Sequence, residues 1–258
     1  VMDYDKLIAP AAAAMRPSGI RKFFDLAAEM PECISLGVGE PDFKTPWAVR
    51  EAGIESLEHG RTRYTSNAGL KELRAEIARY LDRRMGLKYD PAKEVLVTVG
   101  GSEAIDLGLR AVLSPGDEVL IPAQSYGAYG NTAKRFKGTP VYVPMRGDKG
   151  IDLDAVLDAI TPKTKLIFIC NPNNPTGMAL NDEELLDFIR KVPDHVMVVV
   201  DEAYFQFIRR EDYKTALDAI TEENCRVMVI RTFSKVYGMA GARVGYVVSS
   251  LEVIRYLS

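Results

Sequence analysis

The feature that most constrains the fold is a regular alternation, from residue 94 onward, of short apolar runs with segments of helical periodicity. The runs are rich in valine and isoleucine and too short for helices, so they favour strands. This alternation predicts a mostly parallel sheet with helices on its faces. The predicted strands are residues 94–99, 118–121, 140–144, 165–170, 196–200, 227–230 and 244–248, and the predicted helices are residues 101–113, 126–138, 153–160 and 181–192, the last with Asn181 as its N-cap.

The chain before residue 94 predicts a different organisation. Residues 47–60 and 69–85 carry apolar side chains near helical spacing and predict two amphipathic packing helices. Residues 34–43 look like an apolar strand interrupted by glycine and proline. We therefore expect residues 1–45 to form an N-terminal arm and segment outside the main sheet, and residues 46–258 to form one large domain.

Composition excludes several classes of function. The net charge is -3 and charges of both signs are interspersed, so there is no electrostatic case for nucleic-acid binding. No apolar stretch is long enough for a membrane-spanning helix, so no membrane partner is expected. Three widely spaced cysteines predict free thiols and a cytoplasmic protein. The two histidines, His59 and His195, are too isolated to predict a metal site.

In a sheet of this type, ligands bind where the parallel strands end. After the first predicted strand, Gly100 and Gly101 open a helix whose backbone amides could hold a phosphate, although a tight turn is the simpler explanation of these glycines taken alone. Tyr126 follows the second strand and could stack on a planar ring or pack under a loop. Neither feature is specific by itself.

The next strand ends carry more specific side chains. The loop NPNNPTG at residues 171–177 is stiffened by two prolines, so Asn173 and Asn174 are placed to donate to a ligand oxygen. Asp201 directly follows five apolar residues and needs a cation or donor as partner, unless it is a helix N-cap. Lys235 lies in the loop TFSKVYGMAGAR, after the strand at residues 227–230.

Taken together, the strand ends offer the parts of a single site. A phosphorylated, planar, cationic ring with an aldehyde would use all of them. Pyridoxal phosphate needs a lysine to hold it as a Schiff base, an acid to keep its pyridine nitrogen protonated, and donors for its phosphate. The sequence therefore predicts a pyridoxal phosphate site.

Six motifs carry a family resemblance. They are SLGVGEPDF, RYTSNAGLKELRAEIA, GGSEA, CNPNNPTG, DEAY and TFSKVYGMAGARVG, spread from about residue 34 to residue 248. In this order they resemble the fold-type I, class I/II aminotransferases. The resemblance implies the three-layer α/β/α large domain of that family around a mostly parallel sheet. The family's C-terminal small domain is expected to be absent, because the chain ends at residue 258.

The resemblance also implies roles for individual residues. Lys235 would form the Schiff base and carry the proton, and Asp201 would pair with the pyridine nitrogen. Asn174 and Tyr204 would bond the ring's phenolic oxygen, and Tyr126 would stack on the ring. The phosphate would be held by Gly101, Ser102, Glu103, Thr232, Ser234 and Arg243. A homodimer is implied, with Tyr64 reaching the neighbouring subunit's site and Gly39 lying near the substrate.

The implied reaction is transfer of an amino group from an amino acid to a 2-oxo acid. The early motifs are similar to the aspartate and aromatic branch and the later ones to histidinol-phosphate aminotransferase, so the substrate is left unassigned. The family's carboxylate-binding arginine belongs to the domain expected to be absent; Arg21 and Arg63 are the alternatives. A carbon-sulfur lyase, a decarboxylase, or a weak or inactive module that binds pyridoxal phosphate would carry the same residues.

Overall fold

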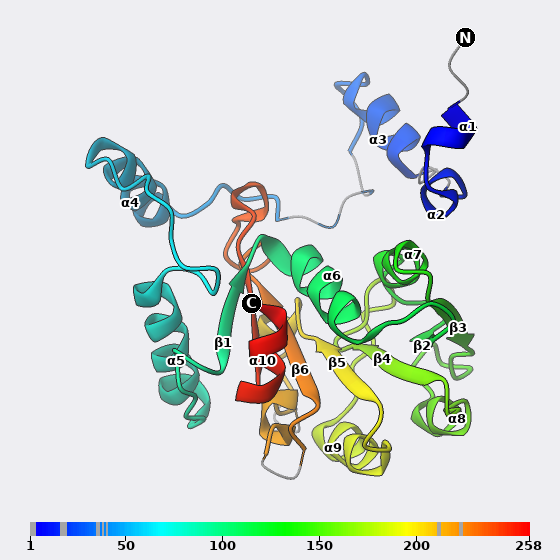
Figure 1. The fold of residues 1–258 in the computed structure, drawn as a ribbon. Coiled ribbons are helices and arrows are strands. Elements are labelled where there is room, and N and C mark those ends of the chain that lie inside the picture. Colours follow the sequence, from blue (N-terminus) through cyan, green and yellow to red (C-terminus); the bar gives the residue numbers. More distant parts are fainter. Residues whose placement is uncertain are drawn as a thin grey trace.

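The computed structural model describes residues 4–15, 20–34, 37, 39, 41–210, 213–221 and 224–258. In this part of the chain, helices cover both faces of a seven-stranded sheet (Figure 1), so the predicted three-layer fold is confirmed. The strand order is β1-β7-β6-β5-β4-β2-β3. The strands are β1 (Val95–Thr98), β2 (Glu118–Pro122), β3 (Thr139–Val143), β4 (Thr164–Cys170), β5 (Met197–Asp201), β6 (Val227–Thr232) and β7 (Gly245–Ser249).

All strands run in the same direction except β7, which is antiparallel to both of its neighbours, β1 and β6. Strands β5 and β6 lie in the middle of the sheet, and their valine and isoleucine side chains are fully buried on both faces. A continuous apolar run is what a strand covered on both faces requires. This explains why the central strands read as uninterrupted apolar segments in the sequence.

Two hydrophobic clusters join the helices to the sheet. On one face the cluster includes side chains of α5 (Lys71–Met85), α8 (Leu153–Asp158) and α9 (Asp182–Lys191). On the other it includes side chains of α6 (Gly100–Val112), α7 (Ala128–Arg135) and α10 (Leu251–Leu257). Helix ends follow local chemistry: the predicted N-cap Asn181 forms a reciprocal capping box with Glu184 at the start of α9. After the last turn of α5, Gly86 takes a φ of 72°, which glycine adopts most readily.

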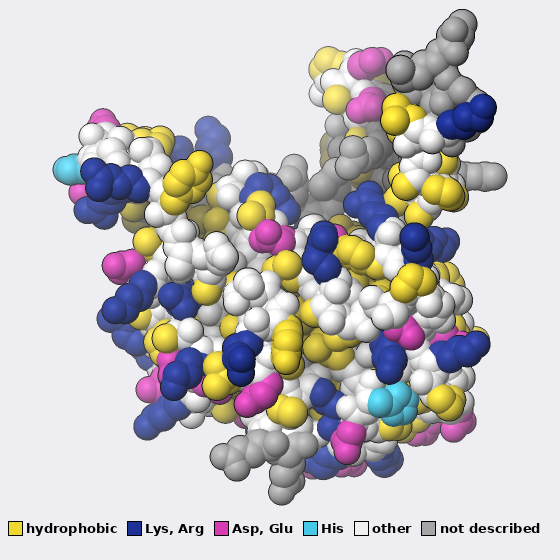
Figure 2. All heavy atoms as spheres, viewed as in Figure 1, with side chains coloured by type: hydrophobic (Ala, Val, Ile, Leu, Met, Phe, Trp, Pro, Cys, Tyr) yellow, Lys and Arg dark blue, Asp and Glu magenta, His cyan; other side chains and the backbone are white. Residues whose placement is uncertain are grey.

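The N-terminal part differs from the sheet region. It contains α1 (Tyr4–Leu7), α2 (Pro10–Ala13), α3 (Ile20–Ala28) and α4 (Trp47–Glu58), and α4 and the part with α1–α3 stand away from the sheet (Figure 1). No residue of α4 is buried. Figure 2 shows hydrophobic side chains on the surface of both projecting parts. The expected strand within residues 34–43 is not found at its described positions, 34, 37, 39 and 41–43; its other positions lie outside the described residues. The domain boundary at residue 45 stays a prediction.

The described ranges also bear on membrane and metal binding. Within them, no helix combines the length and the apolar character needed to cross a lipid bilayer. Across the same residues, no three His, Cys, Asp or Glu side chains are grouped as a metal site would require. His59 and His195 instead bond the backbone carbonyls of Glu55 and Thr161 through their ring nitrogens.

Candidate functional site

A cavity of about 230 Å³ opens at the edge of the sheet where the parallel strands end. Ten of the predicted site residues line it: Gly101, Ser102, Tyr126, Asn174, Asp201, Tyr204, Thr232, Ser234, Lys235 and Arg243. Strand direction explains why residues so distant in sequence meet here. Most of them follow the carboxyl ends of β1, β2, β4, β5 and β6, and Arg243 precedes β7, whose antiparallel course starts it at the same edge.

Asp201 ends β5 at the base of the cavity and is only 6% exposed. The Tyr129 hydroxyl donates to Asp201 Oδ2 at 2.7 Å, and the Ala203 amide donates to Oδ1 at 3.0 Å. Burial is the largest influence on this carboxyl and raises its pKa above the ordinary value, while the two hydrogen bonds oppose that rise. A cation bound in the cavity would therefore favour the ionised form of Asp201.

Tyr129 is a site residue that the sequence pattern did not assign. It is fully buried in α7, and its ring stacks on Phe168 with centroids 4.2 Å apart and planes 7° apart. This packing fixes the position of the hydroxyl against Asp201. The available signal was its place three residues after Tyr126, which does not show which way the side chain points. Cys170 is a second unassigned residue at the cavity wall, and burial raises its pKa to about 12, so it lies there as a neutral thiol.

Lys235 lies in the turn that follows β6. Its Nζ donates to the Gly39 carbonyl at 2.7 Å and sits 5.3 Å from the centroid of the Tyr204 ring. The turn closes with a bond from the Gly238 amide to the Lys235 carbonyl at 2.9 Å, and Gly238 has a φ of 64°. The amine is therefore held at the cavity wall by contacts from two distant parts of the chain.

One end of the cavity has the chemistry of an anion site. Helix α6 begins at Gly100, and the N-cap residue before it, Val99, has a side chain that cannot accept from the first amides. The guanidinium of Arg243 lies so close to Gly100 that any side chain there would collide with it. The Thr232 hydroxyl donates to Ser234 Oγ at 2.8 Å, which orders two more hydroxyls nearby. Helix-start amides, an arginine and hydroxyls together suit a phosphate group.

The remaining predicted residues are placed differently. Glu103 is not part of the cavity lining; its Oε2 accepts from the Val99 amide at 2.5 Å, so this carboxylate folds back on the start of α6. Asn173 donates to the Gln124 carbonyl and to the Thr176 hydroxyl, and so stabilises the loop while Asn174 lines the cavity.

Two further groups of expected residues lie away from the cavity. Tyr64 is fully exposed, and Arg63 is exposed as well; neither lines the cavity. The side chain of Arg21 lies outside the described residues.

The donor set fits pyridoxal phosphate in three separate respects. An amine lies at the cavity wall. A buried carboxyl lies at the base, and among the described residues no cation is hydrogen-bonded to it. The anion cradle, formed by the first amides of α6, Arg243 and the hydroxyls of Thr232 and Ser234, lies at the start of α6. Each group matches one part of the cofactor: the aldehyde, the ring nitrogen and the phosphate, respectively. The residues present therefore fit this cofactor.

Comparison with known proteins supports the same assignment. YugH of Bacillus subtilis, which is named as an aminotransferase without a stated substrate, is 48% identical over 235 residues, covering 90% of this chain and 61% of YugH. Aspartate aminotransferase of Pyrococcus abyssi is 38% identical over 247 residues, covering 93% of this chain and 62% of that protein. The solved structure of aspartate aminotransferase from Thermus thermophilus with maleate matches with a TM-score of 0.88 at 32% identity, covering 97% of this chain and 66% of that one.

The chain thus spans about three fifths of the length of the curated relatives named above. The family description "aminotransferase class I and II" matches residues 31–258, which include every strand of the sheet and every residue that lines the cavity. The match extends over most of the chain. The chain therefore belongs to the class I and II aminotransferases, a family that depends on pyridoxal phosphate.

Proposed function

We propose that this protein is a pyridoxal-phosphate-dependent aminotransferase that transfers an amino group from an amino acid to a 2-oxo acid. The observation that carries the proposal is the presence in one cavity of Lys235, the buried Asp201 and the anion cradle at the start of α6. When bound, the cofactor supplies an electron sink conjugated to the carbon that carries the amino group. The residues of the chain supply binding, orientation and proton transfer.

Lys235 would both anchor the cofactor and act as the general base. In the second role, once the substrate's amine has displaced it, its Nζ would take the proton from the α-carbon of the substrate and deliver it to the carbon of the former aldehyde group, and the reverse half-reaction would move a proton the opposite way. The Gly39 carbonyl, which accepts a bond from Nζ at 2.7 Å, keeps the amine at the cavity wall. Gly39 lies where we propose that the substrate approaches.

The ring would be held from two sides. Asp201 would accept a hydrogen bond from the protonated pyridine nitrogen, and Asn174 and Tyr204 would bond the phenolic oxygen. Tyr126 would stack on the ring; its own ring is fixed edge-on to Tyr129 with centroids 5.6 Å apart. These contacts would orient the cofactor while leaving the face toward Lys235 open.

The phosphate would be bound by the backbone amides of Gly101, Ser102 and Glu103, by the hydroxyls of Ser102, Thr232 and Ser234, and by Arg243. The contact of the Glu103 carboxylate with the Val99 amide supports an amide role for this residue, because a carboxylate itself would repel a phosphate. Arg243 suits the site because its planar guanidinium can bind two phosphate oxygens at once.

We also propose a homodimer in which Tyr64 contributes to the partner's site. Two observations support it: Tyr64 is fully exposed in its own subunit, and α4 exposes Trp47, Ile54 and Leu57. A cytoplasmic location is proposed because Cys33, Cys170 and Cys225 are all free thiols. Light scattering of the purified chain would test the dimer.

The cofactor assignment is tested by adding pyridoxal phosphate to the purified protein. We expect a visible absorption band from the bound cofactor that is lost in Lys235→Ala. The absence of a band in folded wild-type protein would overturn the assignment. Amino donors would then be screened: formation of a 2-oxo acid with the aminated cofactor supports transamination, whereas release of pyruvate and ammonia identifies a lyase and release of carbon dioxide a decarboxylase. Binding without any turnover identifies an inactive module.

A further inference from the structure

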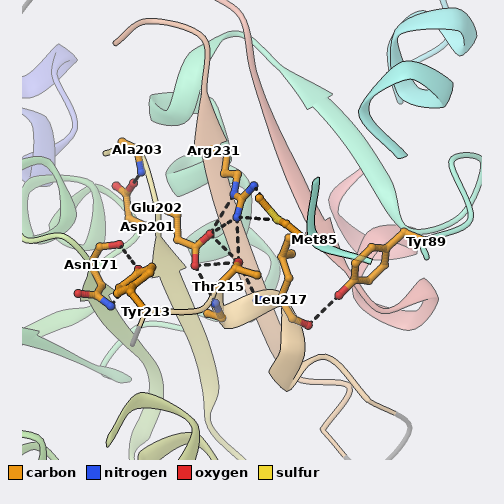
Figure 3. A network of polar contacts seen from close by, with 11 residues as sticks. Met85, Tyr89, Asn171, Asp201, Glu202, Ala203, Tyr213, Thr215, Leu217 and Arg231 are labelled. Carbon is orange, nitrogen blue, oxygen red and sulfur yellow. Dashed lines mark hydrogen bonds and ion pairs between the residues drawn. The ribbon is translucent and has the colours of Figure 1, made fainter. Parts of the chain in front are cut away.

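A fully buried ion pair joins Glu202, which directly follows β5, to Arg231 of β6 (Figure 3). Arg231 Nη2 and Nε donate to Glu202 Oε2 at 2.7 and 2.9 Å, and the two side chains are 1% and 0% exposed. Glu202 directly follows Asp201, and Arg231 directly precedes Thr232. Because successive side chains of a strand point to opposite faces, the pair lies behind two residues of the cavity.

We propose that the Glu202–Arg231 pair fixes the register of β5 against β6 and thereby positions Asp201 relative to Lys235. This role rests on the proposed function, because it concerns the same cofactor site. Neither residue of the pair lines the cavity. Both therefore act through their neighbours.

Strand pairing brings the two side chains together. Asp201 lies opposite Ile230, and the Glu202 amide donates to the Ile230 carbonyl at 2.8 Å, so Glu202 and Arg231 are the next side chains along. A shift of one residue would turn Arg231 to the other face and leave Glu202 buried without a cation. The buried apolar side chains of β5 and β6 are valines, one isoleucine and one methionine, and they discriminate much less between registers. The ion pair is the strongest register signal between these strands.

Stability alone explains such a pair poorly. Removing two charges from water costs several kcal/mol per ion, and uncharged replacements of similar volume are often as stable; the best-attested benefit of buried polar groups is register. Here Glu202 also accepts from the Thr215 hydroxyl and, at 2.7 Å, from the Ala216 amide, so both carboxylate oxygens are bonded. A complete network of this kind favours a single arrangement of its members.

The same pair holds the turn that carries Tyr204. The guanidinium carbon of Arg231 lies 4.2 Å from the centroid of the Phe205 ring, and its Nη2 also donates to Thr215. Glu202 and Phe205 flank Ala203 and Tyr204, so Arg231 contacts both ends of this short segment. Tyr204 in turn lines the cavity beside Lys235.

The test compares variants of the full chain. Arg231→Met leaves Glu202 buried as an unpaired charge and should lower the Tm by about 10 °C. The double variant Glu202→Gln/Arg231→Met removes both charges, but the introduced amide can still bond Thr215 and Ala216, so most of the Tm should return. If the pair sets register, the double variant still binds pyridoxal phosphate about tenfold more weakly than wild type or worse.

Arg226→Met is the matched control. Arg226 precedes β6 at its opposite end, where Nη1 pairs with Asp194 at 3.0 Å and Nη2 bonds the Val192 carbonyl. The same substitution there removes a link between the start of β6 and the connection from α9 to β5, far from the cavity. It should lower the Tm only slightly, because Asp194 is fully exposed, and should leave cofactor affinity within about twofold of wild type.

Hydrogen exchange of the unliganded protein provides a readout that does not depend on the cofactor. In the double variant, exchange should rise in segments 199–207 and 230–238 and stay unchanged in segment 166–170. A double variant with wild-type Tm, exchange and affinity would overturn the inference. If wild type itself binds no pyridoxal phosphate, the proposed function fails, and the exchange comparison still decides whether the pair sets register.

Discussion

Asp201 and Glu202 are consecutive buried carboxylates at the end of β5, yet their surroundings differ completely. Glu202 is paired with an arginine and accepts further bonds from a threonine hydroxyl and a backbone amide. Asp201 accepts bonds from a tyrosine hydroxyl and a backbone amide, and it faces the cavity with no cation hydrogen-bonded to it in the described part of the chain. Glu202 therefore has its cation and its hydrogen-bond donors within the chain, whereas Asp201 can still bind a cationic ligand.

This difference separates a structural role from a binding role. A buried charge that is fully paired contributes to the structure, and removal of one partner leaves the other uncompensated. A buried carboxyl that lacks a bonded cation has a raised pKa, so its ionised form is destabilising until a cation binds. The two faces of β5 can thus be distinguished by substitution, one carboxylate at a time.

The largest effect on stability is expected on the Glu202 face. Glu202→Leu leaves the Arg231 charge buried and deprives the Thr215 hydroxyl and the Ala216 amide of their acceptor. We expect the free energy of unfolding to fall by about 3–5 kcal/mol, measured by urea unfolding of the unliganded protein. A loss below about 1 kcal/mol would show that Arg231 finds another partner and would remove the contrast between the two carboxylates.

The complementary change on the cavity face is Asp201→Asn. The Tyr129 hydroxyl can accept as well as donate, so an amide should be tolerated, and stability should change by about 1 kcal/mol or less. Turnover, in contrast, should fall by about a hundredfold or more, because a neutral amide cannot pair with a protonated ring nitrogen. Urea unfolding and single-turnover kinetics measure the two quantities. Equal losses of stability in Asp201→Asn and Glu202→Leu would contradict the comparison.

Much of the fold could be predicted, because the apolar runs and the helical segments have clear periods. The antiparallel direction of β7 was less apparent, since an alternating pattern favours parallel strands. Its physical reason lies in the connection: between β6 and β7 the chain forms only η3 (Ala240–Ala242) rather than a crossover helix. The predicted strand within residues 34–43 was inferred from apolar content alone. Apolar content does not show whether a neighbouring strand is available to pair with the segment.

The convergence of the cavity residues could be predicted because each of them lies next to the end of a strand. The contacts that hold these residues in place could not be predicted. Tyr129 meets Asp201 across 72 positions only because α7 packs on the sheet above Phe168. Arg231 meets Glu202 only in one particular register of β5 against β6, which the apolar pattern of the two strands does not specify. In both cases the two residues that are in contact can be identified only from the three-dimensional structure.

The smallest expected effect is a pH dependence on the Asp201 face. Burial raises the folded-state pKa of Asp201 above the unfolded value, so the folded protein binds the proton more tightly. The contribution of this group to stability is therefore fully present below the unfolded pKa and is lost as the pH rises through the folded pKa. Urea unfolding across this range should show a fall in stability with rising pH for wild type relative to Asp201→Asn.

Tyr129→Phe sharpens this pH test because it removes a hydrogen bond that lowers the pKa of Asp201. The fall in stability should then extend to higher pH, together with a loss of about 1–2 kcal/mol for the missing hydrogen bond. Tyr213→Phe is the control: it removes another buried hydroxyl, which bonds Asn171 and not Asp201, and should leave the pH range unchanged. Parallel curves for wild type, Tyr129→Phe and Asp201→Asn would mean that the pKa of Asp201 is the same in the folded and the unfolded chain, which would contradict a buried carboxyl that lacks a bonded cation.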